Sequence, residues 1–226
     1  MSLILCMDTT LETATVGLAE KGVLLFSEEN TIQNDHSAWI HTAIRKLMHN
    51  ASATLNDLSA VAVASGPGSY TGIRVGMATA KGLCYALRKP LITENILKLT
   101  ATAMRTAMSD QLEVVPAFFC PMIDARRMEV YTALYNIELE PVQEPSAVLL
   151  DEHSFIAELS NHIIAFGGNG SDKWKSVCKH PNALFTGVRH QLANLAAIAS
   201  KKFNSHDFAD LAYSEPDYFK NFYSGK

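Results

Sequence analysis

The stretch from Ala60 to Gly72 reads Ala-Val-Ala-Val-Ala-Ser-Gly-Pro-Gly-Ser-Tyr-Thr-Gly. Its first five residues are apolar throughout, which is typical of a strand that is covered on both faces of a sheet. A glycine-rich turn follows, and then a helical pattern runs from Ile73 to Leu87, beyond which Pro90 prevents its continuation. A strand that leads through a turn into a helix is half of a crossover connection. We therefore expect a sheet that contains parallel strands and carries helices on its faces.

Further elements flank this unit on both sides. Strands are predicted at residues 3–8, 14–19, 23–28 and 91–93, and helices at residues 38–49 and 96–108. Asn34 or Asp35 is the expected cap of the first helix. Three strands joined by tight turns, followed by alternating helices and strands, predict a mixed α/β sheet flanked by helices. This order is similar to that of the ribonuclease-H-like unit in actin-type folds.

The second half of the chain repeats the pattern less regularly. Strands are predicted at residues 114–123, 129–136, 163–166 and 183–185, and helices at residues 151–159 and 192–203. A sharp turn, Gly167–Gly168–Asn169–Gly170, follows the third of these strands. We expect two ribonuclease-H-like lobes, residues 1–108 and a smaller, degenerate lobe over residues 109–226. The tail from Asp207 is expected to pack back across a lobe.

The composition restricts the class of protein. The chain has 226 residues, of which 48% are hydrophobic and 19% are charged, as is typical of a globular protein. A net charge of -4 argues against tight, unaided binding to nucleic acid, although the tail mixes lysines with aromatic residues. No apolar run reaches the roughly 20 residues that a membrane helix needs, and the first residues lack the basic region of a signal peptide. The sequence therefore predicts neither a membrane span nor a signal peptide.

Residues that bind metals or act as nucleophiles are scattered. Cys6, Cys84, Cys120 and Cys178 each lie in or beside an apolar run and form no C-x-x-C pair. They are expected to be core thiols in a reducing compartment. The histidines form neither H-x-x-x-H nor H-E-x-x-H, and no G-x-S-x-G elbow occurs. The sequence therefore predicts neither a metal site nor a catalytic residue.

Two turns of the first half have the chemistry of a phosphate site. Asp8–Thr9–Thr10 places an acid and two hydroxyls at the end of the first strand, which suits a metal-bound phosphate but also a turn that closes a hairpin. On these residues alone the hairpin turn is favoured. The turn from Gly66 to Gly72 precedes a helix N-terminus, which attracts anions, but it is neither a Walker A loop nor a dinucleotide loop. A ligand loop and a structural turn are both open for it.

The two long helices of the first half are unusually apolar. From Ile73 to Leu87 only Arg74 and Lys81 are charged, so this helix must be buried on nearly all sides. One face covers its own sheet, and small residues let another helix approach the remaining face closely. We expect both helices to form a partner interface; the alternative is that they cover each other and the second lobe. The expected interface residues are Trp39, Ile40, Ala43, Ile44, Leu47, Ile73, Gly76, Met77, Ala80, Lys81 and Cys84.

Several motifs together resemble one known family. They are the opening Leu5–Thr10, Asp35–Ser37, Gly66–Gly76, Met122–Tyr131, Gly167–Gly170 and Glu215–Phe219. Over essentially the whole chain they resemble the TsaB family, also called YeaZ. The resemblance implies a two-lobed, actin-like fold in the bacterial cytoplasm. It also implies a role in making N6-threonylcarbamoyladenosine (t6A), beside the anticodon of tRNAs that read codons starting with A.

The same resemblance implies a set of partners. TsaB is a noncatalytic paralogue of TsaD, the enzyme that transfers the threonylcarbamoyl group to tRNA, and the two form a heterodimer that the ATPase TsaE joins. Members of the family use their first two helices for this heterodimer or for a homodimer when alone. The resemblance also implies that this chain reaches tRNA through the complex and does not associate with membranes.

The sequence departs from the active members of the superfamily at two places. TsaD carries an H-x-x-x-H metal motif, and the matching segment here, Glu94–Thr100, contains no histidine. Actin-type kinases keep a second glycine-bearing phosphate loop after an Asp, whereas this chain reads Asp124-Ala-Arg-Arg-Met. Arg126 and Arg127 suit pairing with acids or with phosphate.

A relic nucleotide site is therefore expected rather than a working one. We expect no cofactor in the isolated chain, and ATP or ADP with Mg²⁺ only in the complex. The alternative is an actin-fold ATPase or kinase that uses Asp8 and Mg²⁺. The residues of the expected vestigial phosphate site are Asp8, Thr9, Thr10, Gly66, Gly68, Gly168 and Asn169.

Overall fold

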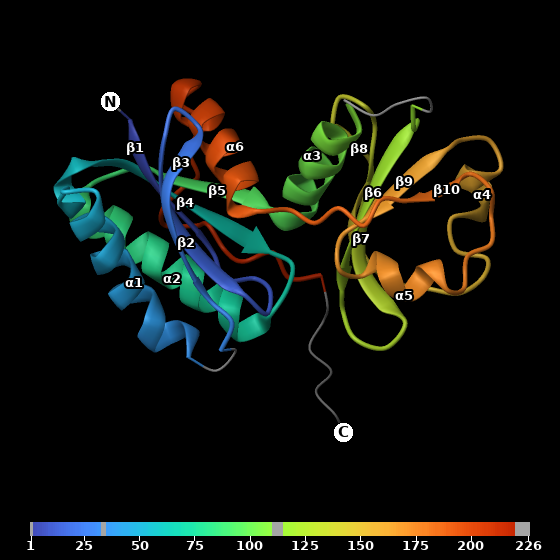
Figure 1. Cartoon of the computed structure of the whole chain (residues 1–226), viewed down its shortest axis with the longest axis horizontal. Coiled ribbons are helices and arrows are strands. Elements are labelled where there is room, and N and C mark those ends of the chain that lie inside the picture. The colour runs from blue at the N-terminus through green and yellow to red at the C-terminus, as the bar shows by residue number, and fades with distance from the viewer. Residues whose placement is uncertain (1, 33–34, 110–114, 220–226) are drawn as a thin grey trace. The chain divides into compact units, whose positions relative to one another are not determined.

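A computed structural model describes residues 2–32, 35–109 and 115–219 (Figure 1). The chain divides into two compact units. Unit 1 comprises Met1–Ile96 and Gln191–Asp217, and unit 2 comprises Leu97–His190 and the chain from Tyr218. Each unit is built on one five-stranded mixed sheet.

The sheet of unit 1 has the strand order β3-β2-β1-β4-β5. Its strands are β1 (Leu3–Asp8), β2 (Ala14–Glu20), β3 (Val23–Asn30), β4 (Leu58–Gly66) and β5 (Leu91–Asn95). The pairs β1–β2 and β2–β3 are antiparallel, whereas β1–β4 and β4–β5 are parallel. The meander and the parallel crossovers confirm the expected ribonuclease-H-like order.

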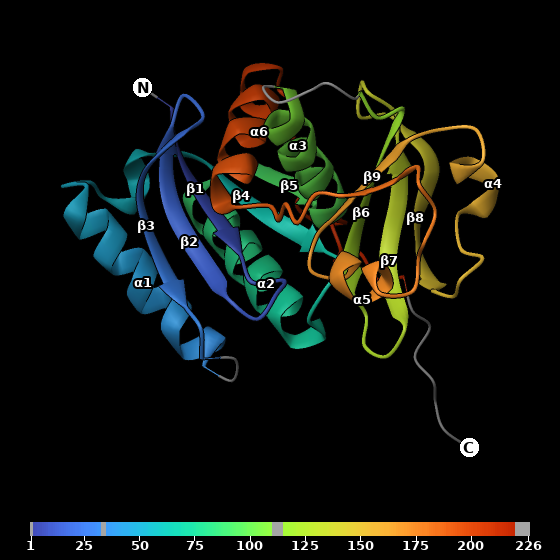
Figure 2. The same cartoon turned by 45° about the vertical axis from the view of Figure 1, so that its right-hand side comes forward.

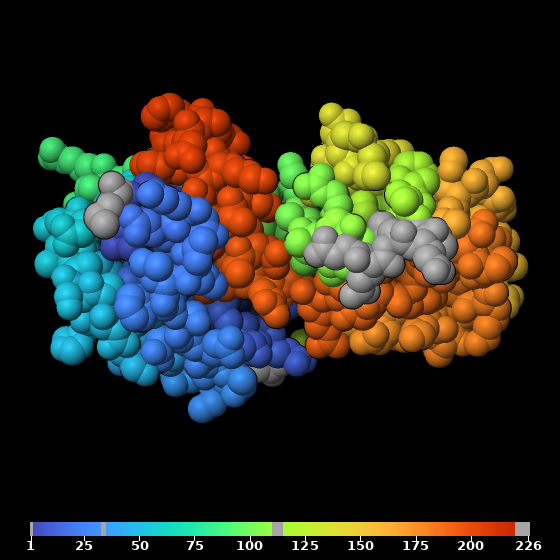
Figure 3. All heavy atoms as spheres, turned by 45° about the horizontal axis from the view of Figure 1, so that its top comes forward, coloured from blue at the N-terminus to red at the C-terminus, as the bar shows by residue number. Residues whose placement is uncertain are grey.

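Helices cover both faces of this sheet, as Figure 2 shows. The helices are α1 (His36–Asn50), α2 (Tyr70–Leu87) and α6 (Leu192–Asn204), and a 3-10 turn lies at Leu55–Asp57. Val16 and Leu18 share one core with α1 and α2. Successive residues of a strand point to opposite faces, and a Cβ at Gly17 would lie 2.9 Å from Leu192 Cδ2 on α6. The helix α6 therefore covers the other face, where its atoms lie beside the N-terminal strands in Figure 3.

The sheet of unit 2 has the order β10-β9-β6-β7-β8. Its strands are β6 (Phe118–Asp124), β7 (Glu129–Tyr135), β8 (Pro141–Leu149), β9 (Ile164–Gly167) and β10 (Ala183–Phe185), and its helices are α3 (Ile96–Ser109), α4 (Ile156–Leu159) and α5 (Ser171–Lys175). Strand β6 is antiparallel to β7 and parallel to β9. Trp174 is fully buried against Phe166 and donates its indole N–H to the carbonyl of Asp151 at 2.9 Å.

Three elements of unit 2 differ from the prediction. Strand β8 was not expected, because Pro141 and Pro145 interrupt the strand pattern; proline is tolerated here because β8 is an edge strand. The helix predicted at 151–159 is a single turn over 156–159, and α5 was missed. The predicted start of β6 at residue 114 lies outside the described residues, as does Asn34, and Asp35 precedes α1 without a side-chain capping bond.

The division into units also differs from the expected lobes 1–108 and 109–226. Residues 97–109 belong to unit 2, and residues 191–217 return to unit 1. Strand β5 runs into α3 at Asn95–Ile96 without any turn residue, so the sequence shows no break there. The apolar face of α6, with Leu195, Ala196 and Ala199 fully buried, explains the return of the chain to unit 1. No helix among the described residues is both long and apolar enough to span a membrane.

Candidate functional site

The β1–β2 turn packs tightly against the start of α2. The hydroxyl of Thr9 donates to the carbonyl of Gly72 at 2.7 Å, and the amide of Ser69 donates to the carbonyl of Thr10 at 2.7 Å. A Cβ at Gly68 would overlap the carbonyl of Thr10, and one at Gly72 would overlap that of Thr9. These glycines therefore seat the neighbouring turn of the chain itself.

Asp8 is used within the same turn. It is buried, and its Oδ1 accepts hydrogen bonds from the amide of Thr10 at 2.9 Å and from the hydroxyl of Thr10 at 2.6 Å. Thr9 and Thr10 are fully buried. The donors that were expected to hold a phosphate are thus engaged inside the protein. This geometry favours the structural alternative for both turns: Asp8 closes the hairpin, and the glycines let α2 approach it.

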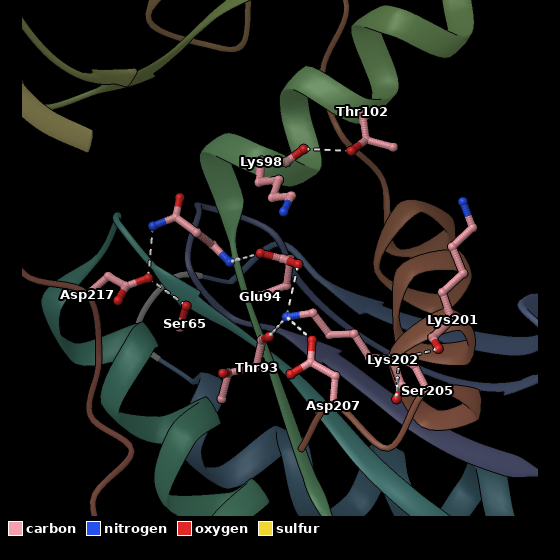
Figure 4. Close-up of polar contacts among 11 residues, drawn as sticks. Ser65, Thr93, Glu94, Lys98, Thr102, Lys201, Lys202, Ser205, Asp207 and Asp217 are labelled. Carbon is pink, nitrogen blue, oxygen red and sulfur yellow. Dashed lines mark hydrogen bonds and ion pairs between the residues drawn. The ribbon is translucent and has the colours of Figure 1, made fainter. Parts of the chain in front are cut away.

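The carboxyl end of β4 is occupied by the C-terminal strap, which we define as residues 207–217. Asp217 Oδ2 accepts a hydrogen bond of 2.6 Å from the hydroxyl of Ser65 and one of 2.8 Å from Asn95 Nδ2, and the amide of Asp217 donates to the carbonyl of Ser65 (Figure 4). A Cβ at Gly66 would lie 3.0 Å from the carbonyl oxygen of Asp217. Open α/β sheets usually bind ligands outside the carboxyl ends of their parallel strands. Here the chain places its own carboxylate there, and a carboxylate repels phosphate.

The strap is held at further points. Lys81 Nζ donates to the carbonyls of Ala212 at 3.2 Å and Ser214 at 2.9 Å, and the amide of Ala209 donates to the carbonyl of Leu91 at 2.9 Å. Lys81 was expected at a partner interface. In the structure its ammonium group tethers the strap to α2.

The segment Glu94–Thr100 begins with an internal ion pair. Lys202 Nζ on α6 lies 3.1 Å from Glu94 Oε2 and donates to the carbonyl of Thr93 at 2.8 Å, with Asp207 more distant at 3.9 Å (Figure 4). Glu94 is 7% exposed, and its other oxygen accepts from the amide of Asn95 at 3.0 Å. The negative charge of Glu94 is therefore compensated by the ammonium group of Lys202. Among the described residues, no group of three or more His, Cys, Asp or Glu side chains is arranged to hold a metal ion.

Most of the expected interface residues lie in the core of unit 1. Nine of the eleven are buried, and only Trp39 and Lys81 are partly exposed. The apolar residues of α1 and α2 pack against strands β1, β2 and β4. Gly76 lies so close to Thr9 that a Cβ on Gly76 would overlap the hydroxyl of Thr9. The sequence shows which residues of the two helices are apolar, but it does not show how many of them the sheet covers. The nine buried residues are Ile40, Ala43, Ile44, Leu47, Ile73, Gly76, Met77, Ala80 and Cys84.

A different face of α2 is exposed. We call it the outer face of α2 and define it as Ala78, Gly82, Tyr85 and Ala86, all of which are exposed. Residues four apart lie above one another on a helix, so Ala78, Gly82 and Ala86 form a line of small residues. Tyr85 beside them is 80% exposed, and a Cβ at Gly82 would meet no atom within 4 Å. The sequence pattern did not reveal this face, because the interface was predicted from apolar residues and this face carries mostly small ones.

The remaining residues of the expected phosphate site lie in unit 2. The side-chain carbonyl of Asn169 accepts a hydrogen bond of 3.0 Å from the amide of Asp124. Gly168 has a φ of 90°, and a Cβ there would overlap the carbonyl of Met122. The predicted set thus separates into one group in each unit. Asp217 and Lys202 were missed as site residues: only the motif Glu215–Phe219 pointed to the first, and no local pattern marks the second.

The cysteines are unsuited to chemistry. All four are free and buried, which confirms their assignment to the core. Burial raises the pKa of Cys6 to about 12, the pKa of Cys120 to about 12 and the pKa of Cys84 to about 11. These three side chains are therefore neutral thiols at neutral pH, and the thiolate is the form that attacks substrates and binds metals.

The two five-stranded mixed sheets with their flanking helices define an actin-like α/β protein of two units. A family model described as TsaD, tRNA N6-adenosine threonylcarbamoyltransferase, matches residues 29–222. The chain is 26% identical to the tRNA threonylcarbamoyladenosine biosynthesis protein TsaB of Bacillus subtilis, over 96% of this chain and 93% of that protein. It is 27% identical to the TsaB protein of Escherichia coli, over 96% and 94%.

A solved structure of a Pseudomonas aeruginosa protein with similarity to the peptidase YEAZ has the same fold. It superimposes with a TM-score of 0.79 at 22% identity, over 97% of this chain and all of that one. The chain belongs to the TsaD family and, within it, to the TsaB (YeaZ) group.

Proposed function

We propose that this chain acts in the biosynthesis of t6A in tRNA, as a noncatalytic partner of a TsaD-type threonylcarbamoyltransferase. The family match and the names of the relatives from B. subtilis and E. coli support the pathway. The modified base is the adenosine beside the anticodon in tRNAs that read codons starting with A. The chain works in the cytoplasm and reaches tRNA only through the complex.

The ion pair between Glu94 and Lys202 is the observation that supports a noncatalytic role. Glu94 is the only acid in the segment that matches the metal motif, and Lys202 Nζ lies 3.1 Å from its carboxylate. Leu97 and Leu99 in the same segment are buried apolar residues. A metal-dependent transfer needs an open coordination site, and this segment offers a neutralised carboxylate and a packed core instead.

The outer face of α2 is the proposed contact with the partner. Its small residues allow the backbone of a facing helix to come close, and Tyr85 supplies a large exposed aromatic side chain of the kind that anchors interfaces. The same face pairs with a second copy when the chain is alone and with TsaD in the heterodimer. TsaE joins the heterodimer, and ATP or ADP with Mg²⁺ binds only in that complex.

Reconstituted t6A formation tests this proposal. Purified TsaD, TsaE, tRNA and threonylcarbamoyl adenylate are combined with the wild-type chain, with Gly82→Ala or with Gly82→Trp. We expect modification with the wild type and with Gly82→Ala, none without TsaD, and a loss of at least tenfold with Gly82→Trp. Equal rates with and without the chain would overturn the role in t6A formation. Equal rates with Gly82→Trp and Gly82→Ala would overturn only the interface.

A further inference from the structure

A cavity lies in unit 1 at the end of the sheet opposite to the β1–β2 turn. Ser2 precedes β1 and Lys21 follows β2, and because these strands are antiparallel both residues stand at that end. The turn after β2 also reaches α6: a Cβ at Gly22 would lie 3.4 Å from the Cβ of Ser200 and 3.8 Å from its hydroxyl oxygen. The cavity has a volume of about 560 Å³ and is lined by Ser2, Lys21, Ser200, Phe203 and Asn204. Small-molecule sites commonly have volumes of roughly 300–1,000 Å³.

The polar side chains of this cavity are not used by the rest of the chain as far as the structure describes it. Within the described residues, the ammonium group of Lys21 makes no ion pair, and the side chains of Ser2 and Asn204 make no hydrogen bond. The hydroxyl of Ser200 has no partner among them either, although Ser200 is only 9% exposed. Buried polar groups of native proteins are rarely left without a hydrogen bond. Four such side chains around one cavity therefore indicate a polar ligand.

The charge of the cavity comes from Lys21. The described residues that line the cavity include no acid and no arginine. Glu20 precedes Lys21, but it lies on the opposite face of the sheet, because Gly17 and Ala19 share the face that α6 covers. One ammonium group compensates one negative charge, whereas phosphate is usually bound by arginine forks or by the amides of a helix N-terminus. A carboxylate is therefore the anion that fits this cavity.

The end of α6 adds two further preferences. The helix ends at Asn204, which lines the cavity, and the C-terminus of a helix carries partial negative charge that favours a cationic group. Phe203 supplies an aromatic surface, and its ring packs against Phe208 with centroids 5.9 Å apart. The cavity thus offers partners for a carboxylate, for an ammonium group and for an apolar side chain.

These three preferences are combined in one class of small molecule. We propose that the cavity binds a free amino acid with an apolar side chain. Its carboxylate contacts the ammonium group of Lys21 and the hydroxyl of Ser200, its ammonium group lies at the end of α6, and its side chain packs against Phe203. The site lies at the other end of the sheet from the β1–β2 turn, and it does not depend on the role of the chain in t6A formation.

An NMR titration of the isotope-labelled full chain tests the site. The probes are L-phenylalanine, L-phenylalaninamide, which lacks the carboxylate, and N-acetyl-L-phenylalanine, which lacks the ammonium group. We expect L-phenylalanine to shift the amide signals of Gly22 and Ser200 until they saturate. Each derivative should bind about tenfold more weakly, because it loses one charge-assisted interaction.

Two lysine variants locate the charge. Lys21→Gln should bind L-phenylalanine about tenfold more weakly, since the carboxylate loses its ammonium partner. Lys201→Gln is the matched control: Lys201 is an exposed lysine next to Ser200 that does not line the cavity, so this variant should bind like the wild type. Both substitutions lie at exposed positions, and thermal melts check that each variant is folded.

Each outcome decides for or against the site. Weaker binding by Lys21→Gln, with Lys201→Gln unchanged, supports it. Equal affinity of Lys21→Gln and the wild type overturns it, as does the absence of any saturable shift with L-phenylalanine. Equally tight binding of either derivative overturns the assignment to an amino acid. Equally tight binding of inorganic phosphate also overturns it, because the cavity would then be an unselective anion site.

Discussion

The hydroxyl of Ser65 donates a 2.6 Å hydrogen bond to the carboxylate of Asp217, which lies 152 residues further along the chain. Ser65 stands next to the first glycine of the motif that looks most like a phosphate loop. The contact therefore joins the C-terminal strap to the end of β4, where open α/β sheets usually bind their ligands. The strap therefore fills the position at the carboxyl end of β4 with the chain's own residues.

We expect Asp217→Ala to lower the free energy of unfolding by about 1–3 kcal/mol, because the hydroxyl of Ser65 and the amide of Asn95 lose a charged acceptor. Urea unfolding followed by circular dichroism gives the value. Glu215→Ala is the matched control, since Glu215 is an exposed acid two residues away in the same strap. Equal losses in both variants would show that the Asp217 contacts do not anchor the strap.

Lys202→Ala is expected to cost about 3 kcal/mol, because it leaves the buried carboxylate of Glu94 without its counter-ion. Adding Glu94→Gln to this variant should recover part of the loss, since the uncompensated charge is then absent. A double-mutant cycle of urea midpoints measures the coupling. Lys201→Ala, which removes an exposed lysine at the neighbouring position of α6, should be nearly neutral. Purely additive losses would contradict the assigned ion pair.

The buried thiols predict a loss of stability at high pH. The folded-state pKa values of Cys6 and Cys120, each about 12, lie above the ordinary value of 9.0. The folded state therefore keeps protons that the unfolded state releases, so this contribution is fully present below pH 9 and is lost as the pH rises toward 12. Unfolding free energies measured across this range should fall, and less steeply in Cys6→Ala. At pH 8 both thiols should resist alkylation until urea is added.

Gly82 and Ala80 distinguish the outer face of α2 from its buried face. Gly82→Ala should raise the free energy of unfolding by about 0.8–1 kcal/mol, since the site is an exposed helix interior with open space around it. Ala80→Trp should lower it by more than about 1–3 kcal/mol, since Ala80 is fully buried and the core has no room for an indole. Thermal melts measure both. A tolerated Ala80→Trp would mean that α2 packs with a different face inward.

Asp8 gives a test of the alternative function as an ATPase or kinase. Its carboxylate is engaged by Thr10, so we expect the isolated chain to release no phosphate from ATP and Mg²⁺ above background, with Asp8→Asn no different. Asp8→Ala should still lower the free energy of unfolding by about 1–3 kcal/mol through the loss of the turn. Magnesium-dependent turnover that disappears in Asp8→Asn would restore the enzymatic alternative.

Local patterns in the sequence were enough to predict the sheet of unit 1. The apolar run Ala60–Ala64 and the turns at Lys21–Gly22 and Gly66–Gly72 are short-range signals, and they give the order of strands and helices along the chain. Strand β8 escaped prediction because its prolines are acceptable only at a sheet edge, and an edge is a property of the whole sheet.

The candidate site was predictable only in its residue types. Gly68, Gly72 and Gly76 recur every four residues, but the sequence does not say whether a ligand or the β1–β2 turn fills the space beside them. The partners that settle this are distant in sequence: Thr9 approaches Gly72 across 63 residues, and Asp217 reaches Ser65 across 152. Without those contacts, an occupied phosphate loop and an open one look the same.

The most direct test of the central claim is the mass of the complex with TsaD, measured by light scattering on a sizing column. The chain is run alone, then mixed with TsaD, and the variants Gly82→Ala and Gly82→Trp are then each mixed with TsaD. The account predicts a new peak at the heterodimer mass for the wild type and for Gly82→Ala, and separate peaks for Gly82→Trp. Two unchanged peaks for the wild type would contradict the claim that this chain is a direct partner of TsaD through the outer face of α2.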